Sequence, residues 1–134
     1  MGAITFAQPD VALRASVLAY IAANPTDTDI AVTTANVITD GNIPTSGARV
    51  LKIEASAAKG NGPVEGAFIT LTAYSSTSNV ADGRPFAYRL KDVLPRLAGA
   101  FVITDVNGPS KGSDLTSRRV WILTCRLLQT GADE

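Results

Sequence analysis

Two alternating segments on either side of a glycine-rich turn constrain the fold of this chain most strongly. In residues 48–58, ARVLKIEASAA, apolar and polar side chains occupy opposite faces: Leu51, Ile53 and Ala55 on one, Lys52, Glu54 and Ser56 on the other. Residues 67–76, AFITLTAYSS, repeat the alternation with Ile69 and Leu71 opposite Thr70, Thr72 and Tyr74. Between them, Asn61-Gly62 is typical of a hairpin turn. We therefore predict two half-buried antiparallel strands joined by a turn over residues 59–66.

A helix and a shorter strand are expected before this hairpin. Residues 8–25, QPDVALRASVLAYIAANP, place Val11, Ala15 and Leu18 at helical spacing. Pro9 suits a first helical turn, and Asn24-Pro25 ends the pattern. Residues 29–38, DIAVTTANVI, are rich in β-branched side chains and predict a strand, followed by a loop over 39–47.

After the hairpin we expect a second helix, a strand, a loop and a last strand. The helix begins near Asp82 or Arg84, because Pro85 fits a first turn, and Pro95 bends or ends it after about three turns. Its apolar stripe consists of Phe86, Leu90, Val93, Leu94 and Leu97. Residues 100–106 form the next strand. In the last strand, 117–129, the apolar residues do not share one face, which indicates a register break or burial on two sides. The expected order is α-β-β-β-α-β-β in one domain spanning residues 1–134, with flexible ends at about 1–7 and 130–134.

The loop before the last strand contains Gly108-Pro109-Ser110-Lys111-Gly112-Ser113, which raises the question of a phosphate site. A phosphate-binding loop has its lysine after the second glycine and is followed by a helix. Here Lys111 precedes Gly112 and a strand follows. The spacing and context therefore favour a turn in the chain.

Catalytic and metal-binding residues are sparse. The chain has no histidine, which removes the commonest general base and metal ligand. Cys125 lies in an apolar strand, where a free cysteine is usually a core residue. Asp27 and Asp29 could hold a cation weakly, but turn-forming residues between helix and strand explain them better. We predict no catalytic, cofactor-binding or metal-binding residue.

The charge balance and the cysteine count of the chain indicate little about its partners. The 12 basic and 12 acidic residues balance, so no strong global attraction to nucleic acid or to an anionic membrane is expected. The sequence contains no apolar run of membrane-spanning length and no secretory signal. A lone cysteine cannot form an internal disulfide, which favours a reducing compartment of origin.

Two groups of basic residues are candidates for partner contacts. Arg84, Arg89, Lys91 and Arg96 give the second helix a basic face, which is either a solvated face or an ion-pairing surface for a partner subunit. Arg118 and Arg119 next to Trp121 carry residue types that are enriched at interfaces. An arginine pair on an edge strand would equally discourage sheet aggregation.

The order of elements resembles that of the tail terminator, or tail completion, proteins of long-tailed bacteriophages. The resemblance covers about residues 8–129. It rests on the strand FITLTAYSS, the Ser/Asn-rich break into the helix in STSNVADGRPFAYRLKDVL, and the terminal arrangement of a strand, GPSKGSD and RRVWILTCRLL. It is a match of pattern and order, without a diagnostic residue signature.

This resemblance implies a fold and a role. The fold would be α+β, a mainly antiparallel sheet with both helices packed on one face. The protein would form a ring, usually a hexamer, that caps the tail tube and docks to the head-tail connector or stopper protein, without catalysis or cofactor. It would be made in the host cytoplasm and lie at the head-proximal end of the virion tail, with DNA passing through the ring lumen.

The resemblance also directs attention to surfaces. Contacts with neighbouring rings are expected at the Lys59–Gly66 hairpin tip and the Gly108–Asp114 loop, and subunit contacts near the arginine pair. The candidate interface residues are Lys59, Asn61, Glu65, Lys111, Asp114, Arg118, Arg119 and Trp121.

Two alternatives remain open at this point. The first is another virion component: a tail tube protein, a head-completion protein or a minor tail protein. The second is a small ligand-binding or enzymatic α+β domain, which would need a concave pocket lined by convergent polar groups.

Overall fold

The computed structural model describes residues 4–5, 9–34, 49–57, 64–76, 81–97, 99, 101–112, 118–130 and 132–133. Its elements follow the order β1 (Ile4–Thr5), α1 (Pro9–Ala22), the 3-10 turn η1 (Pro25–Asp27), β2 (Ala31–Thr33), β3 (Val50–Ala57), β4 (Val64–Tyr74), α2 (Arg84–Val93), the 3-10 turn η3 (Leu94–Arg96), β5 (Phe101–Gly112), β6 (Val120–Thr130) and β7 (Ala132–Asp133). The α+β class and the order of the main elements are as predicted.

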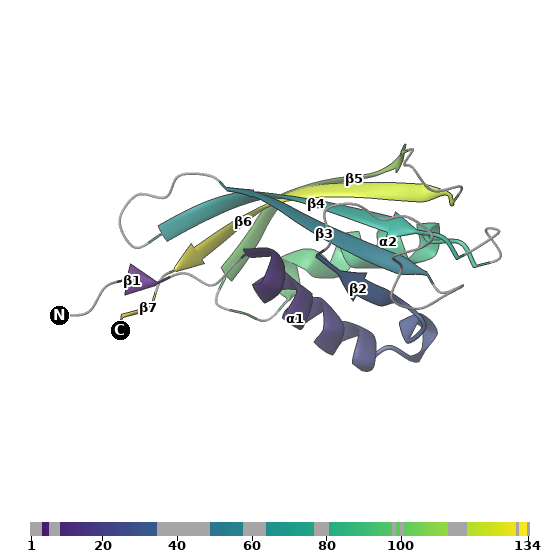
Figure 1. The fold of residues 1–134 in the computed structure, drawn as a ribbon, viewed down its shortest axis with the longest axis horizontal. Helices are drawn as coiled ribbons and strands as arrows, with labels where there is room; N and C mark the ends of the chain where they lie inside the picture. Colours follow the sequence, from purple (N-terminus) through teal and green to yellow (C-terminus); the bar gives the residue numbers. More distant parts are fainter. Residues whose placement is uncertain are drawn as a thin grey trace.

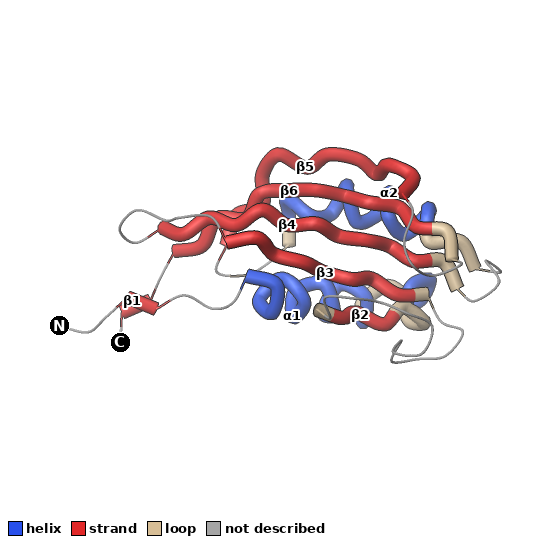
Figure 2. Tube along the Cα trace, turned by 45° about the horizontal axis from the view of Figure 1, so that its top comes forward, coloured by secondary structure: helices blue, strands red, loops and turns tan. Residues whose placement is uncertain are grey.

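Five strands form the main sheet in the spatial order β2-β3-β4-β6-β5 (Figure 2). Strands β3, β4, β6 and β5 pair antiparallel to their neighbours, and the short β2 pairs parallel to β3. The β3–β4 pairing confirms the predicted hairpin strands, while the turn at Asn61-Gly62 lies outside the described residues. The sheet is therefore mainly antiparallel, with one parallel edge strand.

Both helices pack on one face of this sheet (Figure 1). Helix α1 contacts β2 and β3, whereas α2 contacts β4, β5 and β6. The core between the layers joins the helix residues to the inward-facing residues of the strands. Its main members are Leu13, Val17, Ile21, Leu51, Ile53, Ile69, Leu71, Phe86, Leu90, Leu94, Leu123, Cys125 and Leu127. The predicted apolar stripe of the second helix thus faces the sheet, and η3 replaces the α-helix at Pro95 as expected.

A second, smaller cluster lies on the opposite face of the sheet. Val50, Tyr74 and Val120 are cross-strand neighbours on β3, β4 and β6, and all three are buried. Tyr74 lies on the same face of β4 as Thr70 and Thr72, as predicted, and both Tyr74 and Thr72 are buried. The cluster also explains the last strand, because Val120 is buried on one face of β6 while Leu123 and Leu127 are buried on the other.

Strand β5 extends further than the sequence indicates. Gly108–Gly112 was predicted to be part of an exposed loop, but these residues belong to β5 and pair with β6 as far as Gly112↔Val120. The pairing shifts register between Thr104 and Asn107 and again between Asn107 and Ser110. Asp105 (φ 54°) and Gly108 (φ 99°) have positive φ within this irregular stretch, and the Gly108–Pro109 bond is cis. Bulges therefore keep the glycine- and proline-containing segment in the sheet, which a loop prediction does not anticipate.

The two chain ends meet at one end of the molecule (Figure 1). Ile4–Thr5 of β1 pairs antiparallel with Ala132–Asp133 of β7. The sequence indicated no such pairing, and flexibility of the ends remains a prediction.

Candidate functional site

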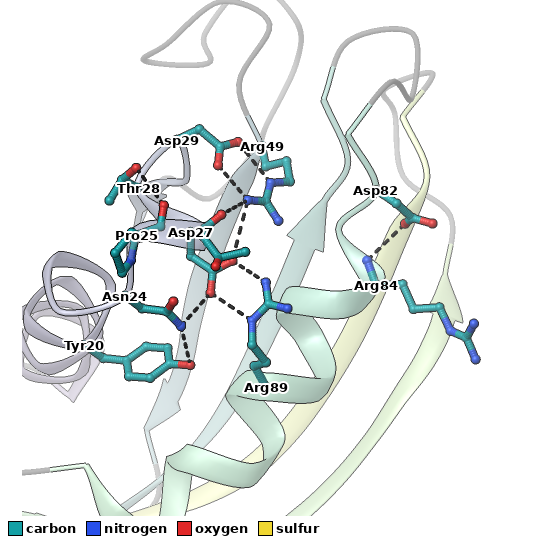
Figure 3. A network of polar contacts seen from close by, with 11 residues as sticks. Tyr20, Asn24, Pro25, Asp27, Thr28, Asp29, Arg49, Asp82, Arg84 and Arg89 are labelled. Carbon is teal, nitrogen blue, oxygen red and sulfur yellow. Dashed lines mark hydrogen bonds and ion pairs between the residues drawn. The ribbon is translucent and has the colours of Figure 1, made fainter.

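A network of charged side chains, of which Asp27 and Arg49 are buried, joins the turn after α1 to β3 and α2 (Figure 3). Asp27 is fully buried and accepts hydrogen bonds from the Arg89 guanidinium, including one from Nε at 3.0 Å, and from Asn24 Nδ2 at 3.2 Å. Arg49 lies 3.5 Å from the same carboxylate and donates to both oxygens of Asp29, at 2.6 and 2.9 Å. The hydrogen bond from Arg49 lowers the pKa of Asp29.

This network defines a structural role for Asp27 and Asp29. The two aspartates bind arginines of the same chain, so their side chains support the turn and do not form an open cation site. Arg89, which was considered part of a solvated or partner-binding helix face, faces inward to Asp27. The sequence did not indicate the ion pair of Arg49 with Asp29, because no local pattern links residues 20 positions apart.

A second cluster lies at the beginning of α2, on the side of the sheet that carries the helices. The Asp82 carboxylate accepts from the backbone N–H of Arg84 at 3.0 Å and from Trp121 Nε1 at 3.3 Å. These hydrogen bonds, the one from the Arg84 backbone first, lower the pKa of Asp82. The Arg84 guanidinium lies 5.3 Å from the ring centroid of Tyr88 and 5.5 Å from that of Trp121. Asp82 therefore ties the start of the helix to β6.

Further basic side chains surround this cluster. Lys91 lies one helical turn from Tyr88, Lys111 is the cross-strand neighbour of Trp121, and Arg119 acts on the Asp82 carboxylate through its charge. Arg84 and Tyr88 are exposed, with 47% of Tyr88 accessible. We call this surface the α2 patch; it consists of Arg84, Tyr88, Lys91, Lys111, Arg119 and Trp121.

A hollow of about 290 Å³ lies over β4, β6 and the bulged part of β5. It is lined by Phe68, Ile69, Thr70, Asp105, Asn107, Thr124, Cys125 and Arg126. Phe68 is 57% exposed, and the Arg126 guanidinium lies 5.6 Å from its ring centroid. Because Phe68 and Arg126 alternate with buried core residues along their strands, the hollow opens on the face without helices. We call it the Asp105 hollow.

The Cys125 thiol forms part of the lining of the Asp105 hollow. Burial raises the pKa of the Cys125 thiol to about 12, so little thiolate is present near neutral pH. Within the described ranges, no group of three or more histidine, cysteine, aspartate or glutamate side chains could hold a metal ion. No described helix is long and apolar enough to cross a membrane.

The predicted interface residues lie in different parts of the chain, and the structure describes only some of them. Lys59, Asn61 and Asp114 lie outside the described residues. Glu65 lies in β4 opposite Gln129 of β6. Lys111 is exposed, but it lies in β5 and not in a loop.

The arginine pair before β6 divides into an inner and an outer residue. Arg118 is only 5% exposed, and its guanidinium lies 3.5 Å from the Ser75 carbonyl of the same chain. It is therefore a poor candidate for a partner contact, because its side chain is buried and contacts a carbonyl of the same chain. Arg119 is exposed, and Trp121 is half-buried beside Arg84. The structure thus retains Lys111, Arg119 and Trp121 on one surface and adds Arg84 and Tyr88.

Comparison with known proteins adds no further assignment. The chain matches neither a protein-family model nor a curated protein sequence. Its fold and its two exposed surfaces are therefore the basis for a functional proposal.

Proposed function

We propose that this protein is a tail terminator of a long-tailed bacteriophage, a ring-forming structural protein that caps the tail tube and docks to the head-tail connector. The observation that carries the proposal is the arrangement of its elements. A helix, a short strand and a two-stranded hairpin precede a second helix and two long strands, and both helices lie on one face. This is the arrangement that the resemblance implies.

The surfaces of the chain support a role in assembly. A ring subunit must contact two neighbours and stacked partners, so it needs several separate binding surfaces. The helix side carries the α2 patch, in which arginine, tyrosine and tryptophan side chains lie together. The opposite side carries the Asp105 hollow with its exposed Phe68. Such residues are enriched at the energetic centres of protein interfaces.

The same features bear on the alternatives. A tail tube protein favours a β-sandwich with one helix, whereas this chain packs two helices on a single main sheet. A small enzyme needs convergent polar groups in a pocket, and the Asp105 hollow offers a protonated, buried thiol and a mixed polar rim.

Negative-stain electron microscopy of the purified protein tests this proposal. We expect closed rings of uniform diameter that do not stack into tubes at rising protein concentration. Open tubes that lengthen with concentration would instead indicate a tail tube protein. Separate small particles at every concentration, together with failure to bind the ends of purified tail tubes, would contradict the proposal.

A further inference from the structure

The Asp105 hollow brings two opposite charges together on the face without helices. Arg126 is the cross-strand neighbour of Thr104, and Asp105 follows Thr104 in β5. Asp105 and Arg126 both line the hollow, and both are exposed. Among the described residues, no ion pair joins Asp105 to Arg126. The hollow therefore has no net charge, but it presents one carboxylate and one guanidinium that can each bind a separate group.

The backbone of β5 brings Asp105 to the hollow. In a regular strand, the residue after Thr104 would point to the opposite face of the sheet, but the register shift that begins at Thr104 changes its direction. Of the described residues other than glycine, Asp105 alone has positive φ, and Asn107 Nδ2 donates to its carbonyl oxygen at 2.9 Å. Such conformations cost energy and cluster at ligand-binding sites, so this one marks the hollow as a candidate site.

The Phe68 ring positions the second charge. The Arg126 guanidinium lies 5.6 Å from the centroid of this ring, and Phe68 is 57% exposed. A guanidinium over an aromatic ring keeps the N–H donors of its own plane free, and those donors match the two oxygens of a carboxylate. The exposed part of the Phe68 ring remains available to an aromatic group.

The rest of the lining suits a small polar ligand. Thr70 and Thr124 are cross-strand neighbours on β4 and β6, and both line the hollow. Their hydroxyl groups can donate and accept hydrogen bonds. The volume of about 290 Å³ is at the lower end of the range of about 300–1,000 Å³ that is typical of ligand pockets. A single small molecule therefore fits the hollow better than a larger ligand.

We infer that the Asp105 hollow binds a free α-amino acid with an aromatic side chain. The ammonium group of the ligand pairs with the Asp105 carboxylate, its carboxylate accepts from the Arg126 guanidinium, and its ring lies against Phe68. A ligand with only one charge would leave one of the two protein charges without a partner in the occupied hollow. This inference goes beyond the proposed function and does not depend on it, because the site lies within one chain.

Isothermal titration calorimetry of the purified full chain tests the selectivity with three probes. L-phenylalanine carries both charges, L-phenylalaninamide carries only the ammonium group, and N-acetyl-L-phenylalanine carries only the carboxylate. We expect L-phenylalanine to bind about tenfold more tightly than either blocked form, because each blocked form lacks one ion pair. The blocked forms also represent the first and last residues of a peptide, so they separate a free amino acid from a chain end.

Two substitutions assign the charges of the ligand to the protein groups. Asp105→Asn, which suits the same backbone conformation, should weaken binding of L-phenylalanine about tenfold and leave N-acetyl-L-phenylalanine unaffected. Arg126→Gln should weaken L-phenylalanine similarly and leave L-phenylalaninamide unaffected. Asp92→Asn and Arg96→Gln make the same chemical changes in an exposed ion pair on α2 and should leave all three affinities unchanged.

The contribution of the ring has its own test. We expect wild type to bind L-phenylalanine more tightly than L-alanine, and Phe68→Leu to reduce that difference because the leucine side chain offers no ring to the ligand. Equal affinities for these two amino acids would overturn the aromatic part of the inference.

The selectivity of the wild type decides the inference even where a variant fails to fold. Absence of binding by L-phenylalanine, or equal binding of all three probes, would overturn it. Tighter binding of either blocked form would overturn it in favour of a peptide end. None of these results would bear on ring formation, so failure here leaves the tail terminator proposal intact.

Discussion

At the scale of single residues, Asp27 has the largest structural role that can be assigned. Its carboxylate is fully buried, and the side chains that satisfy it come from the turn after α1, from the residue before β3 and from α2. One buried acid therefore fixes the position of both helix-side elements relative to the sheet. Removing this buried acid would leave Arg89 without its carboxylate partner and Arg49 with Asp29 alone, which makes the position sensitive to substitution.

We predict that Asp27→Ala lowers the free energy of unfolding by about 3 kcal/mol, because it leaves two arginine side chains without their shared partner. Chemical denaturation measured by circular dichroism provides the value. Asp92→Ala removes an exposed ion pair with Arg96 on α2 and serves as the control, with little expected change. Equal effects of the two substitutions would contradict this role for Asp27.

Asp82 gives a prediction about pH. Its pKa in the folded protein is below 3.8, first because the Arg84 backbone N–H donates to the carboxylate. The unfolded state therefore binds more protons as pH falls through 3.8, so the stabilisation by Asp82 is present above this pH and is lost below it. We expect the stability difference between wild type and Asp82→Asn to shrink as pH falls below 3.8 in thermal melts. A difference that stays constant with pH would refute this assignment.

From the sequence, it was easier to predict that a residue is buried than to predict which groups its side chain contacts. The position of Cys125 in an apolar strand correctly indicated a core thiol, which the structure buries. Arg118 looked like a surface residue, but it folds back onto the Ser75 carbonyl. No local sequence pattern indicates this contact, because Ser75 and Arg118 are 43 residues apart.

At the scale of elements, β5 departs most from expectation. A Gly-Pro-Ser-Lys-Gly run normally predicts a loop because glycine and proline interrupt strands. Here two bulges absorb the extra residues, and Gly108 adopts the positive φ that one of them requires. The elements with clear periodicity, α1, α2 and the β3–β4 hairpin, were predictable because their apolar spacing records the face that they bury.

Gly108→Ala tests the bulge. A Cβ at this position would lie 2.5 Å from the Ile122 carbonyl oxygen, and the φ of +99° is unfavourable for alanine. We expect a loss of about 2 kcal/mol in unfolding free energy. Gly112→Ala on the same strand is the matched control, because its Cβ would meet the flexible end of the Ile122 side chain. If both substitutions cost the same, the special conformation of Gly108 would not matter to stability.

At the scale of the whole molecule, the central feature is a sheet with one face covered by helices and the other bearing an exposed phenylalanine and a hollow. Order and periodicity predicted the main elements, and the resemblance implied that both helices pack on one face of the sheet, as they do. The sequence could not predict the α2 patch or the Asp105 hollow, because each joins residues from separate strands and helices. Assembly through these two surfaces is what would make a small domain a tail terminator.

The mass of the purified protein in solution, measured by native mass spectrometry, tests the central claim most directly. Six copies of the 13.9 kDa chain give 6 × 13.9 = 83.4 kDa, and we expect a discrete species of that mass. Another closed ring number would retain the ring and correct the count. A single 13.9 kDa species at every concentration and in the presence of tail tubes, or a continuous ladder of growing oligomers, would contradict the claim that this chain forms a terminating ring.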